Sequence, residues 1–353
     1  MGESDIQGWQ GAVDWKRASE AFPNASLWGN GNGISPDDVI QGQIGNCWFM
    51  SAASAIAERP GRMEKIFLNE GMDKLNKPGI YAINIYALGV PHTVVVDDFL
   101  PLRENEDGTY ATQYANVGND KSMWAAILEK AFAKYHGNYS HLSGGLGELA
   151  VRTMLGGPFE RFWHYEGYKV EINVDDLWAQ LVEHDGKGDI IQTGTKSGSD
   201  TELNEMGLAL GHQYTTLGVK QLTTGERLVK VRNPWGSNRF NGPWSVQSPL
   251  WTDAARAETG YAGEADHNKG IFWMTIEDYH ANFADTVINY DPEGMHMDYF
   301  LSLDEDGTGG YPSPGMPEGT FTADLEITSE VDQTIWITAH TWNNRPLGQS
   351  CKY

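Results

Sequence analysis

The run QGQIGNCWFM, from Gln41 to Met50, constrains this chain more than any other segment. Its glycines predict a turn, and the apolar, alanine-rich stretch that follows predicts a helix over residues 46–58. Cys47 then lies in the first turn of that helix, where unpaired N–H groups and a partial positive charge favour thiolate over thiol. A cysteine in such a position is often a nucleophile, although free cysteines are more commonly buried structural residues. Gln41 would supply a side-chain donor beside the same sulfur.

The composition argues against several classes of partner. The chain has 353 residues, with 25 Lys and Arg against 48 Asp and Glu, which gives a net charge of −23. A charge this negative argues against nucleic acid and against anionic membrane surfaces, and it is compatible with binding divalent cations. Cys47 and Cys351 are the only cysteines, so no disulfide framework is expected and a reducing compartment is favoured.

Targeting signals are absent from the sequence as it stands. The N-terminal residues MGESDIQGWQ contain neither a basic segment nor an apolar one, so no secretory signal is visible. No run approaches the length of a transmembrane helix. We therefore expect an intracellular, cytoplasmic protein without a transmembrane segment, and the sequence specifies no oligomeric state.

The patterning of apolar residues divides the chain into two halves of different character. Gly156, Gly157 and Pro158 interrupt the chain between them, because such a sequence cannot continue a helix. We therefore predict a helical domain over 1–157, a β-rich domain over 158–292 and a third segment over 296–353. The last is too short for a complete β-sandwich of about 100 residues. The predicted helices are 46–58, 122–136 and 174–184; the predicted strands are 80–88, 93–100, 188–194, 212–220, 227–233, 271–275, 320–328 and 333–341; residues 101–120 are predicted to be a polar loop.

The β-rich half offers partners for Cys47. His212 begins a predicted strand, and Asn233 follows Val229 and Val231 on the same side of another. A buried carboxamide needs a hydrogen-bond partner. If the Asn233 carbonyl accepts from one ring N–H of His212, the other ring nitrogen is left for sulfur. A single histidine or an Asn-Pro-Trp-Gly turn is more often structural, but the order Cys, His, Asn across a domain boundary favours a thiol nucleophile with a base and an orienting group.

Several further motifs accompany these residues between about 14 and 290. They are QGQIGNCW at 41–48, VVVDDFLP at 94–101, LEKAFAK at 128–134, LSGG at 142–145, GH at 211–212, RNPWG at 232–236 and FWM at 272–274. In this order they resemble the catalytic core of calpain-family cysteine proteases. The resemblance implies an α+β fold of the papain-like two-lobe type, with a helical lobe and a β-rich lobe. It also implies that residues 296–353 are part of a C2-like β-sandwich.

The resemblance implies a calpain-like cysteine endopeptidase that hydrolyses peptide bonds of protein substrates through a thioacyl-enzyme. Cys47 would be the nucleophile, His212 its ion-pair partner and the proton donor to the leaving amine, and Asn233 the group that orients His212. Gln41 and the Cys47 backbone N–H would form the oxyanion hole. The resemblance further implies substrate-binding roles. These fall on Gly145 and Gly211, whose backbones would hold the substrate strand, and on Trp235, whose indole would shield the His–Asn pair.

Calcium is the cofactor that the resemblance raises, although the chemistry itself requires none. Family members usually carry one calcium site in each lobe. Gly33 and Asp38 fit the first-lobe site, which Asp120 would complete, although Ser122 replaces an expected acidic residue. In the second lobe the expected ligand positions hold Arg239, Val246, Lys269 and Ile271. Calcium takes six to eight oxygen ligands, so calcium binding is allowed in the first lobe and is predicted to be absent from the second.

Two other functions fit part of this pattern. A transglutaminase-like acyl transferase also uses Gly-x-Cys-Trp before a helix, but its third catalytic residue is normally Asp, whereas this chain offers Asn233. An inactive calpain-like binding module would keep the three residues without using them. The short third segment favours that reading, because an unfinished sandwich exposes strand edges.

Overall fold

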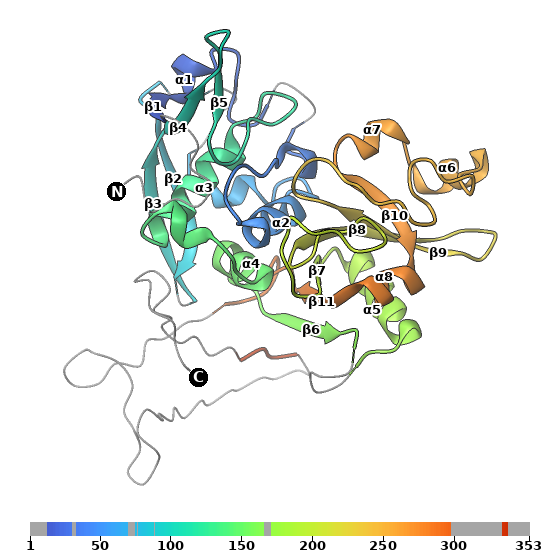
Figure 1. The fold of residues 1–353 in the computed structure, drawn as a ribbon. Helices are drawn as coiled ribbons and strands as arrows, with labels where there is room; N and C mark the ends of the chain where they lie inside the picture. The colour runs from blue at the N-terminus through green and yellow to red at the C-terminus, as the bar shows by residue number, and fades with distance from the viewer. Residues whose placement is uncertain are drawn as a thin grey trace.

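The computed structural model describes residues 13–29, 33–69, 75, 77–87, 89–165, 171–297 and 334–337. Helices and strands are interspersed, so the chain is an α+β protein (Figure 1). Small sheets and helices make up the part before about residue 156, whereas one large sheet dominates residues 159–289.

Helix α2 (Cys47–Ile56) lies between these two parts (Figure 1). All of its residues are buried, because its many alanine and serine side chains allow other elements to approach closely from several sides. Thr215 Oγ1, on the large sheet, donates a hydrogen bond to the Ser51 carbonyl of this helix at 2.8 Å. The predicted helix over 46–58 is confirmed, and Cys47 is its first residue.

Around α2 the first part of the chain packs helix α3 (Trp124–Tyr135) and the antiparallel hairpin β2 (Ile80–Ala87) and β3 (Val90–Asp97). Both were predicted. The prediction of a polar loop over 101–120 is wrong for its first half, since β4 (Phe99–Glu104) pairs with β1 (Asp14–Arg17) and with β5 (Tyr110–Thr112). Leu100 and Leu102 are buried on β4, but the polar turn after them obscures that short alternation. The remaining elements here are α1 (Ala18–Ala21), η2 (Pro36–Asp38), η3 (Glu64–Ile66), η4 (Tyr139–Leu142) and α4 (Gly147–Leu155).

The large sheet has the strand order β10-β9-β8-β7-β11-β6, with every neighbouring pair antiparallel. The four predicted strands are β7 (Ile190–Thr195), β8 (Gln213–Gln221), β9 (Arg227–Arg232) and β10 (Ile271–Thr275). The sequence analysis did not predict β6 (Phe159–Trp163) or β11 (Phe283–Asn289), which complete the sheet at one edge. The helices of this part are α5 (Val174–Lys187), α6 (Asp253–Thr259), α7 (Glu264–His267) and α8 (Ile276–Asn282).

Buried apolar side chains gather in two main clusters. The first draws nearly all its members from residues 18–154 and centres on α2, α3 and the β2–β3 hairpin. The second draws on residues 177–283 and packs α5 and α8 against the large sheet. A smaller group, which includes Trp244, Trp251 and Trp273, lies beside β9 and β10. Each main part of the chain therefore has a core of its own.

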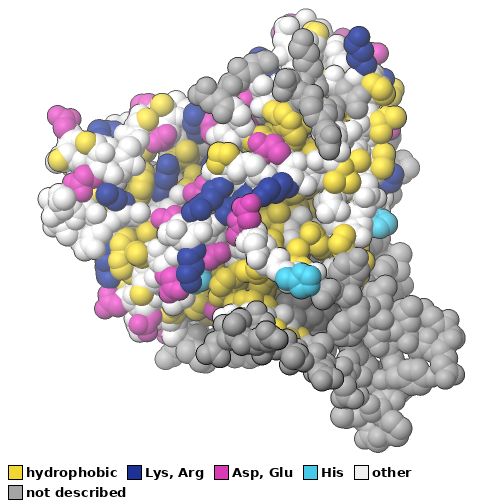
Figure 2. Space-filling view, turned by 180° about the vertical axis from the view of Figure 1, so that it is seen from behind, with side chains coloured by type: hydrophobic (Ala, Val, Ile, Leu, Met, Phe, Trp, Pro, Cys, Tyr) yellow, Lys and Arg dark blue, Asp and Glu magenta, His cyan; other side chains and the backbone are white. Residues whose placement is uncertain are grey.

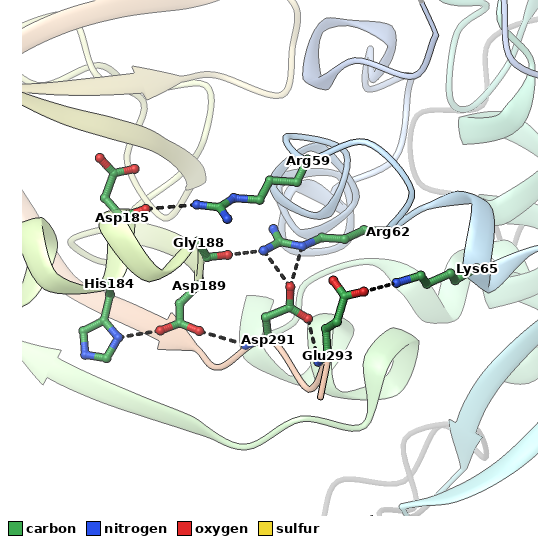
Figure 3. A network of polar contacts seen from close by, with 9 residues as sticks. All are labelled: Arg59, Arg62, Lys65, His184, Asp185, Gly188, Asp189, Asp291 and Glu293. Carbon is green, nitrogen blue, oxygen red and sulfur yellow. Dashed lines mark hydrogen bonds and ion pairs between the residues drawn. The ribbon is translucent and has the colours of Figure 1, made fainter. Parts of the chain in front are cut away.

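Polar contacts join the segment after α2 to the end of α5 and the chain after β11 (Figure 3). Arg62 pairs with Asp291 at 2.7 Å and also donates to the Gly188 carbonyl, while Lys65 pairs with Glu293 at 2.5 Å. Behind them His184 contacts Asp189 at 2.6 Å. Figure 2 shows basic and acidic side chains interspersed across the middle of one face of the molecule. The two parts are thus held by ion pairs as well as by apolar contact.

The third predicted segment lies mostly outside the described residues. Of the predicted strand 333–341, residues 334–337 are described, and they adopt no strand conformation. The predicted strand 320–328 is outside the described residues. Within the described part of the chain, no helix combines the length and the apolar character needed to cross a bilayer.

Candidate active site

The candidate nucleophile stands at the start of α2, where the chain turns from the loop 41–46 into the helix. Cys47 is 9% exposed. Backbone N–H groups in the first turn of a helix have no intrahelical acceptor, so the Cys47 N–H is available to another group. The thiol lies beside the start of β8, where the Gln213 backbone forms a hydrogen bond with it. This hydrogen bond lowers the pKa of Cys47. Gln213 directly follows the candidate base.

The candidate base and its orienting group are in direct contact. His212 Nε2 and Asn233 Oδ1 are 2.9 Å apart, so the amide carbonyl accepts from the ring N–H. Both side chains are buried, with 2% and 3% of their surfaces exposed. His212 Nδ1 is also buried and has no hydrogen-bond partner among the described residues. The sequence analysis predicted this hydrogen bond, and it leaves one ring nitrogen for the sulfur.

Backbone contacts hold this pair in place. The His212 N–H donates to Thr195 Oγ1 at 3.0 Å, and the His212 carbonyl accepts from Thr195 N at 2.9 Å. Asn233 Oδ1 accepts a second hydrogen bond, from Trp235 N at 3.1 Å. The Trp235 ring lies 4.5 Å from the His212 ring, centroid to centroid. The Trp235 ring therefore lies against His212, and its role as a shield of the His–Asn pair stays a prediction.

Burial controls the protonation of both candidate groups. Loss of hydration raises the pKa of Cys47 to about 11, although the backbone of Gln213 opposes this change. Burial likewise lowers the pKa of His212 to about 4, although the hydrogen bond to Asn233 opposes it. Each neutral form is favoured in this arrangement. The expectation that the helix start alone favours the thiolate is wrong here, because desolvation outweighs it.

Gln41 is buried and joined to both parts of the site. Its backbone N–H donates to the Pro234 carbonyl at 2.9 Å, which ties the loop before the nucleophile to the turn after Asn233. Its Nε2 donates to the Ile44 carbonyl at 2.8 Å. A primary amide carries two N–H donors, so one remains for a substrate oxygen. The structure places Gln41 in the loop that leads to Cys47.

The two glycines assigned to substrate binding have structural reasons to be glycine. A Cβ at Gly145 would overlap the indole ring of Trp48, whose Nε1 donates to the Leu142 carbonyl at 2.8 Å. Gly211 has a φ of +55°, and a Cβ there would overlap the Gly198 carbonyl. Packing and backbone conformation therefore explain both residues without a substrate, and their substrate-binding role stays a prediction.

The proposed first calcium site holds carboxylates that already have partners. Asp38 Oδ2 accepts from Ser35 N at 2.8 Å and from Trp124 Nε1 at 3.1 Å. Burial raises the pKa of Asp38 to about 6, and the charge of Asp120 adds to the rise. Gly33 is exposed in the preceding loop. Among the described residues, no three His, Cys, Asp or Glu side chains gather as a metal site.

At the proposed second site, Lys269 pairs with an acidic residue of the first part. Its Nζ lies 2.6 Å from Asp37 Oδ2. The basic side chain that replaces an expected calcium ligand therefore meets a carboxylate directly. The four residues at these positions, Arg239, Val246, Lys269 and Ile271, include no carboxylate.

Arg232 received no role in the sequence analysis, yet it connects the two parts of the site. Its guanidinium is fully buried, donating to the Val39 carbonyl at 2.6 Å, to Ser54 Oγ at 3.1 Å and to the Lys269 carbonyl at 3.1 Å. Burial lowers its pKa to about 10. Val39 precedes the loop that leads to Cys47, and Ser54 lies on α2. Arg232 therefore holds the residue next to it, Asn233, relative to Cys47. On β9, Arg232 alternates with the buried residues Val229 and Val231, so the sequence pattern gave no sign that Arg232 would be buried.

Glu129 is a second residue that was quoted in a motif but given no role. It is 1% exposed, on α3, and accepts hydrogen bonds from Asn46 and from Ala115. The sequence did hold a signal for it. Glu129 follows Ala125 by four residues and precedes Phe132 by three, so it falls on the apolar face of the predicted helix.

Comparison with known proteins gives a consistent result. A family model described as "Calpain family cysteine protease" matches residues 3–290. The calpain-type cysteine protease DEK1 of Arabidopsis thaliana is 34% identical over 256 residues, which is 72% of this chain and 11% of that protein. The calpain-type cysteine protease ADL1 of Oryza sativa subsp. japonica is 31% identical and covers 79% of this chain and 13% of that protein. Calpain-5 of Mus musculus is 30% identical over 78% of this chain and 45% of that protein. The chain thus spans less than half the length of each of these relatives.

Proposed function

This chain belongs to the calpain family of cysteine proteases, and from that premise we propose that it is a cysteine endopeptidase acting on protein substrates. Cys47 is the proposed nucleophile, His212 the acid and base, and Asn233 the residue that orients His212. The observation that carries the proposal is the His212–Asn233 hydrogen bond. It leaves the buried Nδ1 atom of His212 without a partner among the described residues. The next residue, Gln213, contacts the Cys47 thiol through its backbone.

The proposed reaction begins from the neutral pair. The Cys47 thiol transfers its proton to His212 Nδ1, and the thiolate sulfur attacks the carbonyl carbon of the scissile peptide bond. The imidazolium then gives that proton to the leaving amine as the C–N bond breaks, which leaves a thioester on Cys47. Next, His212 removes a proton from water, and the hydroxide attacks the thioester carbon. The carboxylic acid product departs and releases its own proton to solvent, and the sulfur recovers its proton from His212.

Charge on the substrate oxygen needs donors in both attacks. The proposed donors are the Cys47 backbone N–H and the second N–H of the Gln41 amide. Loss of one such donor typically costs on the order of 10²–10³ in kcat. Gly145 and Gly211 are the proposed contacts for the substrate backbone, and Trp235 the cover that keeps water from the His–Asn hydrogen bond.

The proposal extends to the arrangement of the chain. We propose a papain-like pair of lobes, residues 1–157 and 158–292, because the two main apolar clusters divide close to Gly156, which caps α4 with a φ of +81°. A partial β-sandwich over 296–353 is the proposed third unit. A reducing location such as the cytoplasm suits a thiol nucleophile in a chain with two cysteines.

We further propose that catalysis proceeds without bound calcium. Lys269 stands where the resemblance implies a ligand, and it pairs with Asp37, while Asp38 is engaged by Ser35 and Trp124. Hydrolysis of casein in the presence of a strong calcium chelator should equal that in millimolar calcium. A strict calcium requirement would overturn this part of the proposal and leave the assignment of Cys47 intact.

The test of the peptidase itself is labelling by an irreversible thiol-directed epoxide, combined with casein cleavage. Wild-type protein should be labelled at Cys47 and should cleave casein, and Cys47→Ser should do neither. Amine incorporation into glutamine without cleavage would indicate a transglutaminase-like transferase. Absence of both labelling and cleavage would indicate an inactive binding module.

A further inference from the structure

Glu129 is a carboxyl group buried with no cation beside it. The side chain projects from the middle of α3 and is 1% exposed. Only burial and two hydrogen bonds act on its pKa, and none of the described cationic side chains contributes. Burying an acidic side chain without a counter-ion is costly, so an apolar residue at this position would favour folding more. The contacts that the carboxyl makes therefore need an explanation.

Its first contact reaches the residue before the nucleophile. Asn46 Nδ2 donates to Glu129 Oε1 at 2.7 Å. Asn46 occupies the N-cap position of α2, yet its side chain caps no helix N–H. Asn46 is fully buried and its Oδ1 has no partner among the described residues. Glu129 alone therefore sets the orientation of this amide.

The second contact reaches the segment after β5, which supports Gln41. Glu129 Oε2 accepts from Ala115 N at 2.9 Å. The residues around Ala115 hold the loop before Cys47: Gln113 O accepts from Gln43 N at 3.1 Å, and Asn116 N donates to the Ile40 carbonyl at 2.8 Å. Asn116 Nδ2 also donates to the Gln41 carbonyl at 3.3 Å. Gly42 packs so closely on Tyr114 that a Cβ would overlap its carbonyl.

One carboxyl group thus joins the two segments that carry the proposed nucleophile and the proposed oxyanion donor. We propose that Glu129 is a positioning residue: through its hydrogen bonds to Asn46 and Ala115 it fixes the Cys47 sulfur and N–H relative to the Gln41 amide. This inference rests on the proposed role of Cys47. Glu129 contacts neither substrate nor sulfur, so it acts through the geometry of the loop and the helix start.

Three variants separate positioning from simple stabilisation. Glu129→Leu fills similar space but removes both hydrogen bonds. Glu129→Gln keeps both, because its carbonyl accepts from Ala115 and its amide donates to the Asn46 oxygen once that amide turns over. Leu128→Ala is the matched control, a neighbouring buried residue on α3 whose truncation loosens the core but removes neither hydrogen bond of Glu129.

The measurements are kcat, KM and the melting temperature, together with the rate of Cys47 alkylation by iodoacetamide. We expect Glu129→Leu to lower kcat and the alkylation rate by about tenfold to a hundredfold, as small misplacements of reacting groups do, with KM within about twofold of wild type. Glu129→Gln should stay within about threefold of wild type in both rates, because its hydrogen bonds survive. Leu128→Ala should lose melting temperature and keep both rates.

Wild-type rates in Glu129→Leu would overturn the inference, as would equal losses in Glu129→Leu and Leu128→Ala. Rates in Glu129→Gln as low as those in Glu129→Leu would overturn the hydrogen-bond account. Should Glu129→Leu fail to fold, Asn46→Ala replaces it, because it removes the first contact alone. A fall in both rates would then support the inference, and wild-type rates would overturn it. Alkylation of Cys47 does not require peptide cleavage, so it tests the inference about Glu129 even in a protein without peptidase activity. Failure of wild type to cleave casein would refute the proposed function alone.

Discussion

Two buried asparagines flank the proposed reaction centre, and they are held in different ways. Asn233 uses its carbonyl, which accepts from His212 and also from Trp235 N in its own turn. Asn46 uses its amide nitrogen, which donates to Glu129 from a helix 83 residues away in the sequence, and its carbonyl has no partner among the described residues. The proposed base is therefore oriented by local turn structure, whereas the proposed nucleophile is positioned by a long-range contact.

The first prediction concerns the locally held asparagine. Asn233→Ala removes the acceptor that orients His212, so kcat should fall by about 10² to 10⁴, the usual contribution of a positioned acid–base group. The measurement is kcat on a peptide substrate, with Cys47 labelling alongside. Asn238→Ala is the control, since Asn238 is buried nearby and bonds the Ile271 carbonyl at 3.2 Å. Full activity in Asn233→Ala would remove Asn233 from its proposed role in orienting His212.

The second prediction uses the groups that the two asparagines bond, Glu129 and His212, because burial changes their pKa values in opposite directions. Burial raises the pKa of Glu129 from 4.5 to about 7 and lowers that of His212 from 6.5 to about 4. The stability that Glu129 contributes is therefore present below pH 4.5 and lost as pH rises to 7. The stability that neutral His212 contributes is present above pH 6.5 and lost as pH falls to 4. Each change amounts to about 3 kcal/mol at most.

Denaturant unfolding from pH 4 to 7.5 checks these slopes. The free energy of unfolding of wild type minus that of Glu129→Gln should decrease with pH, and the same difference for His212→Gln should increase. The groups that face Glu129, Tyr114 and Tyr139, have pKa values raised by burial and by the Glu129 charge, so they do not titrate in this range. Parallel slopes for the two variants would contradict the assigned environments.

The third prediction concerns the asparagine held at long range. Asn46→Ala leaves one oxygen of Glu129 without its donor, which should lower the free energy of unfolding by about 1–3 kcal/mol. It should also lower kcat by about tenfold, less than Asn233→Ala, because the reacting groups remain and only their spacing changes. A loss of kcat as large as that of Asn233→Ala would mean that Asn46 touches the chemistry directly.

The same contrast explains what the sequence could predict. Local regularities predict helices and strands, as the periodicity of residues 124–135 and 80–97 does. The His–Asn contact was predicted in the same way, from the shared side of Val229, Val231 and Asn233 on one strand. Strand β11 was missed although all its residues are buried, since its sequence, FADTVIN, mixes polar and apolar residues without alternation. The partners of Arg232 and Glu129 lie far away in the sequence, so only the packed structure reveals them.

Protonation was the other feature that the sequence misjudged. The position of Cys47 at a helix start indicated a thiolate, and that argument counted only the local dipole. The thiol is also buried beside the start of β8, and the resulting loss of hydration raises its pKa to about 11. Depth of burial depends on how residues distant in the sequence pack together, which a motif does not record.

The smallest predicted effect belongs to the ion pair between Lys269 and Asp37, which joins the two parts of the chain, whereas each asparagine is held within one part. Lys269 keeps 44% of its side chain exposed, and an exposed pair typically contributes less than about 1 kcal/mol. Lys269→Met should therefore lower the free energy of unfolding slightly, less so at high salt, and should leave kcat unchanged. Urea unfolding at low and high salt gives the measurement. The contrary outcome is a lower kcat in Lys269→Met together with the same fall in wild type at high salt. It would show that this ion pair, and not the buried hydrogen bonds around Asn46 and Asn233, sets the spacing of the reacting groups.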